Sequence, residues 1–123
     1  MTNQTQNSNF KREYDLLERT GKFGEDIIEF AKSIPDNTIN RPLITQLVKS
    51  GTSVGANYEE ADGALSKRDF MHKIGIYKKE SKESRHWLRM IAKADSTKKD
   101  DAKILWQEAH ELTLIFSTIA KKK

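Results

Sequence analysis

The sequence has no cysteine, only two prolines and no long apolar run among its 123 residues. Without cysteine the chain forms no disulfide and carries no thiol chemistry, which fits a reducing cytosol. A membrane-spanning helix needs roughly 20 consecutive apolar residues, and no segment approaches that length. The start MTNQTQNSNFK also lacks the basic-then-apolar order of a secretion signal. We therefore expect a cytoplasmic protein that makes no membrane contact.

Neither basic nor acidic residues are in large excess. The 22 basic and 18 acidic residues leave a net charge of +4, so a basic patch has to arise from clustering rather than from the total. Residues 1–9 are nearly all Thr, Asn, Gln and Ser, with almost nothing to bury that would offset the entropy of ordering them. We expect a disordered tail over residues 1–9 and a single domain over residues 10–123.

Apolar residues recur at steps of three and four through the rest of the chain, which is the spacing of helices with one buried face. This spacing predicts helices over 16–34, 40–63, 66–91 and 97–119, with Asn40 as the cap of the second. No segment has a period-two alternation long enough for a strand. Four amphipathic helices with short connections predict an all-α, antiparallel up-down four-helix bundle.

The helix predicted over 40–63 contains a cluster of small residues, SGTSVGA at 50–56. Two glycines inside a helix cost about 1 kcal/mol each relative to alanine, so a favourable contact should offset them. Close approach of a neighbouring helix at Gly51, Ser53 and Gly55 is one explanation, and a backbone-lined ligand site is the other. A phosphate loop is excluded, because the spacing G-x-x-x-x-G-K-[ST] is absent.

The helix predicted over 66–91 has two regular faces. Its inward seam would be Phe70, Ile74, Tyr77, Ser81, Ser84, Leu88 and Ile91. A second series at the same steps contains apolar side chains that would be costly on the surface of a monomer, and Trp and Met are common in contacts between proteins. We therefore expect a homo-oligomer interface at Ile76, Glu80, Glu83, Trp87 and Met90. A core wide enough to hold Trp87 on its shoulder and a small-molecule pocket are the alternatives.

Two carboxylates lie on that second face. Glu80 and Glu83 cannot be buried without cations or hydrogen-bond donors. Candidate partners are Arg41, Lys49 and Arg85, from the same subunit or from another. Nothing else in the chain supports the two carboxylates as an acid and a base for hydrolysis, so we predict no catalytic residue and no enzymatic activity.

Two pairs, Asp69-x-x-His72 and Glu83-x-x-His86, are similar to the Glu-x-x-His element of di-iron helix bundles. That architecture needs the element on two different helices, whereas both pairs here fall in the same predicted helix. His110 has no companion ligand at a recognisable spacing and is predicted to be structural. We expect no metal and no cofactor.

Four basic residues follow one side of the same helix at steps of four, three and four: Lys78, Lys82, Arg85 and Arg89. Such a row could neutralise about four phosphates, which predicts an electrostatic site for RNA or DNA. The alternative is a solvated charged face with local pairs such as Glu83 to Lys79. No aromatic platform that stacks unpaired bases is recognisable, so base-specific readout is not supported.

The blocks KSGTSVGANYEEADGA at 49–64 and FMHKIGIYKKESKESRHWLRMI at 70–91 resemble the four-helix-bundle family of 23S rRNA intervening-sequence proteins. The most specific parts are S-V-G-A-N-Y-x-E-A at 53–61 and K-E-S-x-E-S-x-x-W-L at 79–88. The likeness extends from about Tyr14 to the last predicted helix, which matches only in pattern. The family implies a small bacterial protein, encoded in some members by an insertion within a ribosomal RNA gene.

A related branch, the accessory proteins of diversity-generating retroelements, looks like a basic homopentameric ring that handles nucleic acid and reverse transcriptase. By that likeness the chain would form a homo-oligomer, specifically a pentamer, without enzymatic activity. The resemblance implies shared structural or interface roles for Asn57, Glu60, Glu80, Glu83 and Trp87, of which Asn57 and Glu60 join the expected helix-packing positions. The net charge of +4 is modest for a protein that binds nucleic acid.

Two functions follow from these patterns. The first is a non-enzymatic, oligomeric bundle that binds RNA or DNA electrostatically through the row from Lys78 to Arg89. The second is a protein-interaction scaffold in which the same cations serve subunit contacts and an acidic partner protein. Neither function involves a small-molecule substrate.

Overall fold

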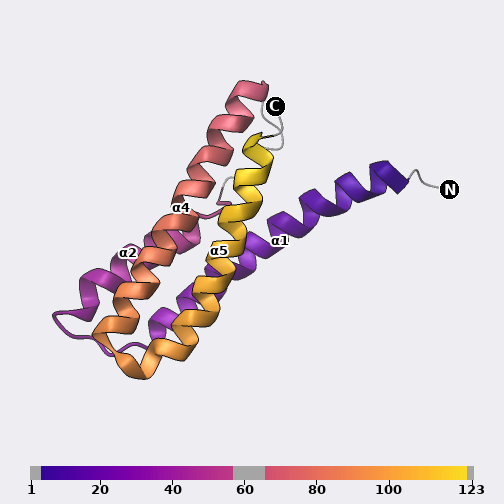
Figure 1. Cartoon of the computed structure of the whole chain (residues 1–123). Coiled ribbons are helices and arrows are strands. Elements are labelled where there is room, and N and C mark those ends of the chain that lie inside the picture. The colour runs from indigo at the N-terminus through magenta and orange to yellow at the C-terminus, as the bar shows by residue number, and fades with distance from the viewer. Residues whose placement is uncertain (1–3, 57–65, 122–123) are drawn as a thin grey trace.

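The computed structural model describes the backbone of residues 4–56 and 66–121, and the side chains from Leu16 onward within these ranges (Figure 1). Four helices dominate these residues: α1 (Gln4–Lys32), α2 (Asn40–Ser53), α4 (Lys67–Ala94) and α5 (Lys99–Lys121), with a short 3-10 turn, η1 (Ser96–Lys98), before α5. Neither range contains a strand. Each of the four helices runs opposite to the one before it (Figure 1). The all-α, antiparallel four-helix bundle predicted from the spacing is therefore confirmed.

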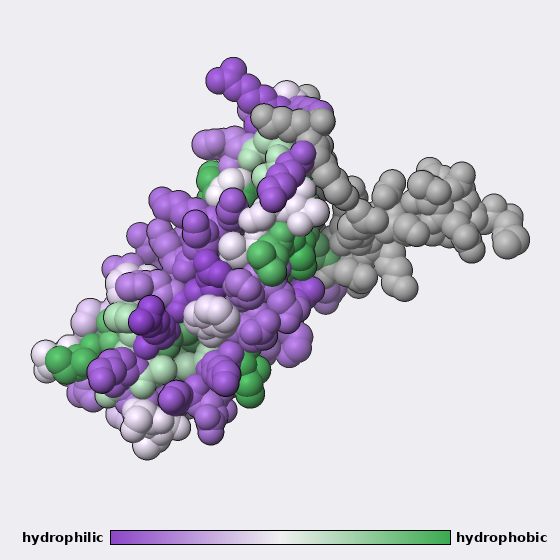
Figure 2. All heavy atoms as spheres, in the orientation of Figure 1, coloured by the Kyte–Doolittle hydropathy of each residue, from purple (hydrophilic) through white to green (hydrophobic). Residues whose placement is uncertain are grey.

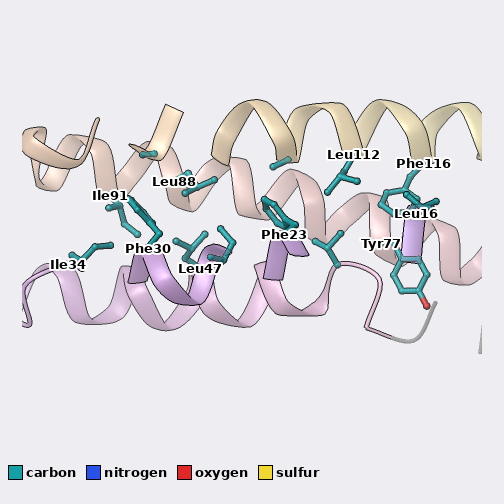
Figure 3. Packing of buried hydrophobic residues seen from close by; sticks show 14 of the residues in the cluster. Leu16, Phe23, Phe30, Ile34, Leu47, Tyr77, Leu88, Ile91, Leu112 and Phe116 are labelled. Atoms are coloured by element: carbon teal, nitrogen blue, oxygen red, sulfur yellow. The ribbon is translucent and has the colours of Figure 1, made fainter. Parts of the chain in front are cut away.

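The core lies between the four helices, and every helix contributes to it. Its largest fully buried apolar side chains are Phe23 and Ile27 from α1, Leu47 from α2, Ile74, Leu88 and Ile91 from α4, and Leu112 and Phe116 from α5. Figure 3 shows these elements directing their apolar side chains into the shared interior. Burial of one such side chain contributes about 1.5–3 kcal/mol relative to leaving it exposed. The seam predicted for α4 is buried from Ile74 to Ile91, while Phe70 is partly buried.

At the start of α2, the free backbone N–H groups are hydrogen-bonded by the side chain of Asn37 rather than by that of Asn40. The Oδ1 atom of Asn37 accepts hydrogen bonds from the backbone N–H groups of Ile39 and Asn40, at 3.0 and 2.8 Å. The Asn40 side chain is buried and donates from Nδ2 to the carbonyl of Pro35 at 3.0 Å. The expected cap at Asn40 is therefore wrong, because the amide of Asn40 closes the turn after α1 instead.

α2 is shorter than its apolar spacing predicts. The helix ends at Ser53, Val54 is extended, and Gly55 has a φ of 75°, in the left-handed region that favours glycine. The chain therefore leaves the helix at residues 54–56, where the spacing predicted that the helix would continue. The remainder of that predicted helix, residues 57–63, lies outside the described residues.

α1 begins at Gln4, inside the segment 1–9 that the composition predicts to be a disordered tail. Figure 1 shows this end of α1 projecting beyond the other helices. The division of the chain into a tail over residues 1–9 and one domain over residues 10–123 stays a prediction.

Candidate nucleic-acid interface

α4 lies between α2 and α5. Its buried seam has one flank on each side, one toward α2 and one toward α5. Successive residues of an α-helix are rotated by about 100°, so the steps of three and four place each predicted row along one flank. We call Lys78, Lys82, Arg85 and Arg89 the basic row, and Ile76, Glu80, Glu83, Trp87 and Met90 the interface row. The basic row follows the flank toward α5 and the interface row follows the flank toward α2. The two rows are thus well separated around one helix.

Two serines allow α4 to approach α2 closely. Ser84 is fully buried and its hydroxyl donates to the hydroxyl of Ser50 on α2, at 3.0 Å. The Ser84 hydroxyl also lies 2.9 Å from the carbonyl oxygen of Glu80, one turn earlier. Small polar side chains with complete hydrogen bonding can be buried at little cost. This contact joins the buried seam of α4 directly to α2.

The basic row is turned toward solvent over most of its length. Lys82 and Arg89 are exposed, and Lys78 and Arg85 are partly buried. Among the described residues, none of the four forms an ion pair with a carboxylate. Figure 2 shows hydrophilic side chains over most of the surface that α4 and α5 present in this view. Within the part of the chain that the structure describes, the positive charges of the row are therefore not paired with carboxylates.

Arg85 differs from the other members of the row because it contacts α5. Its Nη1 atom lies 2.7 Å from Nδ1 of His110, and the guanidinium donates this hydrogen bond because it has no acceptor. The bond requires Nδ1 of His110 to be unprotonated. The guanidinium carbon of Arg85 is also 5.8 Å from the ring centroid of Trp106, within the range of a cation–π contact.

Trp106 and His110 form an aromatic pair that the sequence interpretation missed. Their ring centroids are 5.1 Å apart and the ring planes differ by 13°, so the rings are stacked. Both side chains are partly exposed. The spacing W-x-x-x-H places the two rings on one face of a helix. It is the feature of the sequence from which the pair could have been predicted. The spacing alone does not reveal that this face meets Arg85 of another helix.

Glu80 and Glu83 lie close together on the interface row. The pKa of Glu80 is raised, first by burial, then by the charge of Glu83 and by hydrogen bonding between the two carboxyl groups. Lys79 and Lys49 act in the opposite direction. Of the expected cationic partners, only Lys49 acts on this site within the chain.

The other two expected partners are engaged elsewhere. Arg41 pairs with Asp36 at 3.0 Å, and Arg85 binds His110. In the described part of the chain no cation lies within ion-pair distance of Glu80 or Glu83. The two carboxylates therefore remain only partly compensated.

The apolar members of the interface row differ in exposure. Ile76 is 42% exposed. Trp87 packs against the core as a partly buried residue, and the edge of its ring contacts the ring of His86 at a centroid distance of 4.7 Å. Met90 is partly buried. Trp87 thus lies on the shoulder of its own core and still presents part of its ring outside.

Gly51 of α2, and Gly55 just after the end of α2, lie against α1. A Cβ atom on Gly51 would come within 2.8 Å of Cγ1 of Ile27, and a Cβ atom on Gly55 would overlap Thr20. Ser53 donates its hydroxyl to the carbonyl of Lys49 at 2.6 Å. Because Ile27 and Thr20 fill the space beside the glycines, no room for a ligand is left there. Asn57 and Glu60, also expected at helix contacts, lie outside the described residues.

Neither a metal-ligand cluster nor a membrane-length helix occurs among the described residues. They contain no group of three or more His, Cys, Asp or Glu side chains placed to hold a metal ion. His72, His86 and Asp69 are all exposed on α4. None of the helices in this part of the chain has both the length and the apolar character needed to cross a bilayer.

Comparison with known proteins gives one family and one fold. The family model described as 23S rRNA-intervening sequence protein matches residues 12–118. A crystal structure of a protein of unknown function from the S23 ribosomal protein family of Bacteroides thetaiotaomicron is 24% identical, with a TM-score of 0.76 over 89% of this chain and 98% of that one. At this identity the likeness establishes the fold alone. No curated protein matches the chain.

Proposed function

Because the chain belongs to the 23S rRNA-intervening sequence protein family, we propose that it is a non-enzymatic homo-oligomer that binds RNA or DNA through the basic row. The observation that carries this proposal is the solvent-facing row itself, in which Lys82 and Arg89 are exposed and have no acidic partner among the described residues. Cations of this kind contact phosphates without reading the bases. The expected binding is therefore electrostatic and independent of sequence.

The number of phosphate contacts has a measurable consequence. For duplex DNA, four contacts make the slope of log affinity against log salt about −3.6, and three contacts make it about −2.7. Arg85 is held by His110, so it is the member of the row most restricted in reaching a phosphate. A slope near the lower figure would mean that Arg85 keeps its bond to His110 in the complex.

The proposed oligomer rests on the interface row. Ile76 is apolar and 42% exposed, and Trp87 and Met90 lie partly exposed on the same flank. A second copy packed on this flank would cover the apolar surface and could supply donors to Glu80, whose charge is incompletely compensated. The likeness to the accessory proteins of diversity-generating retroelements supports a pentamer. Because the basic row lies on the other flank, it would stay open in the assembly.

The decisive experiment reverses two exposed charges of the row. The variant Lys82→Glu/Arg89→Glu is compared with Lys22→Glu/Lys32→Glu, which changes the net charge equally at exposed positions of α1. Affinity for structured ribosomal RNA and for duplex DNA is measured over a salt titration. We expect the row variant to lose most of its affinity and its salt slope to become shallower by at least about 1.8, equivalent to two contacts. The α1 variant should lose little.

Unchanged affinity in a row variant that keeps its assembly would contradict this proposal. It would favour the second candidate, a scaffold whose cations serve subunit contacts and an acidic partner protein. Arg85 already bridges α4 and α5 within the chain. A pull-down with an acidic protein would then replace nucleic acid as the assay.

A further inference from the structure

We propose that Trp106 and His110 form a stacking site for an unpaired nucleobase, so that the chain binds single-stranded nucleic acid more tightly than duplex. This inference rests on the proposed function and narrows its ligand class. It is carried by the position of the stacked pair beside the basic row, which only the folded structure reveals.

The pair has the geometry of a platform for a flat ligand. The indole and the imidazole are nearly parallel, with 13° between their planes and 5.1 Å between their centroids. Both side chains are partly exposed, although Trp106 also packs against the core. The two rings cover the faces that they turn to each other, so a base would stack on an outer face of the pair. Because the pair is already held in place, such a base would order little additional structure.

Arg85 connects this platform to the basic row. A hydrogen bond to an imidazole nitrogen lies close to the plane of the ring, along the lone pair of the acceptor. The Nη1 atom of Arg85, which donates to Nδ1 of His110 at 2.7 Å, therefore lies near the plane of the imidazole. The guanidinium carbon of Arg85 is 5.8 Å from the Trp106 centroid. A cation and two aromatic rings thus form one continuous surface.

The charges around the platform suit a phosphate backbone. Lys103 precedes Trp106 by three residues on α5 and is exposed, and Lys82 and Arg89 flank Arg85 on α4. The nearest acidic residues of α5, Glu108 and Glu111, bind Arg19 on the side of the helix that meets α1. Arg19 therefore partly neutralises both carboxylates, while Glu111 is also close enough to His110 for the two groups to interact electrostatically.

The combination selects for unpaired bases. Aromatic side chains stack with bases of single strands, whereas the bases of a duplex are already stacked within the helix. Lysine and arginine contacts to phosphates are available to both ligands. A preference for single strands would therefore come from Trp106 and His110, and the salt dependence from the basic row.

The test separates stacking from charge. Binding of single-stranded poly(dA) and of poly(dA)·poly(dT) duplex is measured at one ionic strength for the wild type, for Trp106→Leu and for Trp106→Phe. We expect Trp106→Leu to weaken single-strand binding by roughly 5- to 150-fold, the range for stacking of one base on an aromatic ring, and to leave duplex binding unchanged. Trp106→Phe keeps a ring and should retain most of the single-strand affinity.

Fluorescence provides a readout that needs no change at position 106. The chain contains two tryptophans and three tyrosines, so Trp87→Phe leaves Trp106 as the only tryptophan, whose emission is excited where tyrosine does not absorb. Because Trp87 belongs to the interface row, light scattering first checks that the variant keeps the mass of the wild type. We expect quenching of its emission by poly(dA) and little quenching by the duplex. This result would stand even if Trp106→Leu lowered the stability of the fold.

The outcomes distinguish this inference from the proposed function. Equal affinity of the wild type for single strand and duplex, with no effect of Trp106→Leu and no quenching, would overturn the stacking site while leaving electrostatic binding intact. Failure of every nucleic acid to bind would overturn both.

Discussion

Arg19 of α1 and Glu108 of α5 form a two-point ion pair, in which Nε donates to Oε2 and Nη2 donates to Oε1, each at 2.7 Å. The Nη2 atom also donates to Glu111 at 2.8 Å. These hydrogen bonds raise the pKa of Arg19 and lower the pKa of Glu111. The arginine therefore joins α1 to α5 through two side chains that are 89 residues apart in the chain.

Replacement of Arg19 by Met should lower the free energy of unfolding at neutral pH by about 0.5–1 kcal/mol, because it removes this pair and keeps an apolar stem. The pKa of Glu111 is depressed in the folded state. Its contribution is therefore complete above the ordinary glutamate pKa of about 4.3, and it is lost as the pH falls through the lower folded value.

Urea unfolding of the wild type and Arg19→Met at pH 7 and in acid checks this prediction. The difference between the two proteins should shrink in acid. Lys22→Met is the control, because it removes only an exposed pair with Asp26 within one helix. An equal effect of both substitutions would mean that the link between α1 and α5 adds no stability.

The contribution of Glu80 to the free energy of unfolding depends on pH in the direction opposite to that of Glu111. Because burial and Glu83 raise its pKa in the folded state, the associated stability is present below the ordinary glutamate pKa of about 4.3 and is lost as the pH rises through the folded value. We expect Glu80→Gln to be more stable than the wild type at pH 7 and equally stable in acid, as measured by thermal unfolding. Glu25→Gln, at an exposed position of α1, should show no such difference. A loss of stability at pH 7 would show instead that Glu80 has a cationic partner.

Gly51 is required by the approach of α1 to α2. An added methyl group would meet Ile27 at 2.8 to 3.1 Å inside the core, and overpacking of this kind costs about 1–3 kcal/mol. We expect Gly51→Ala to lower the denaturation midpoint in urea. Gly21→Ala is a matched control, because it adds the same group to a helix where nothing lies within 4 Å. This control should raise stability by up to about 1 kcal/mol, and a similar gain at Gly51 would contradict the packing argument.

Ile76 offers the cleanest test of the proposed assembly. Its side chain is exposed, so Ile76→Lys should leave the fold intact and reduce the mass in solution to that of a monomer. Ile104→Lys is the control, because Ile104 is an even more exposed isoleucine, at 71%, on α5. Light scattering at micromolar concentration measures both. A monomeric wild type would remove the proposed role of the interface row.

Much of the fold could be predicted because its pattern is local. The steps of three and four along α4 identify a seam that is buried from Ile74 to Ile91. The same spacing failed at the end of α2, because the sequence continues a helical pattern past Ser53. Only the packing of Gly55 against Thr20, together with its positive φ, shows why the helix stops there.

Less of the candidate site could be predicted from the sequence. The spacing of the basic row predicted which cations share a flank, but not that Arg85 would bind His110, 25 residues later. Nor could the spacing place Trp106 beside that flank. Contacts between helices depend on the rotation and the offset of each helix in the bundle, and no single segment determines either of them.

The placement of the two rows on opposite flanks of α4 determines how nucleic-acid binding by an assembly would respond to charge reversal in some of its subunits. If copies join through one flank, the other flank is presented once per subunit at a regular interval. Each subunit then contributes a weak affinity, and a long polyanion that contacts several subunits gains avidity. Mixed assemblies containing a few charge-reversed subunits should therefore lose binding gradually as the fraction of such subunits rises.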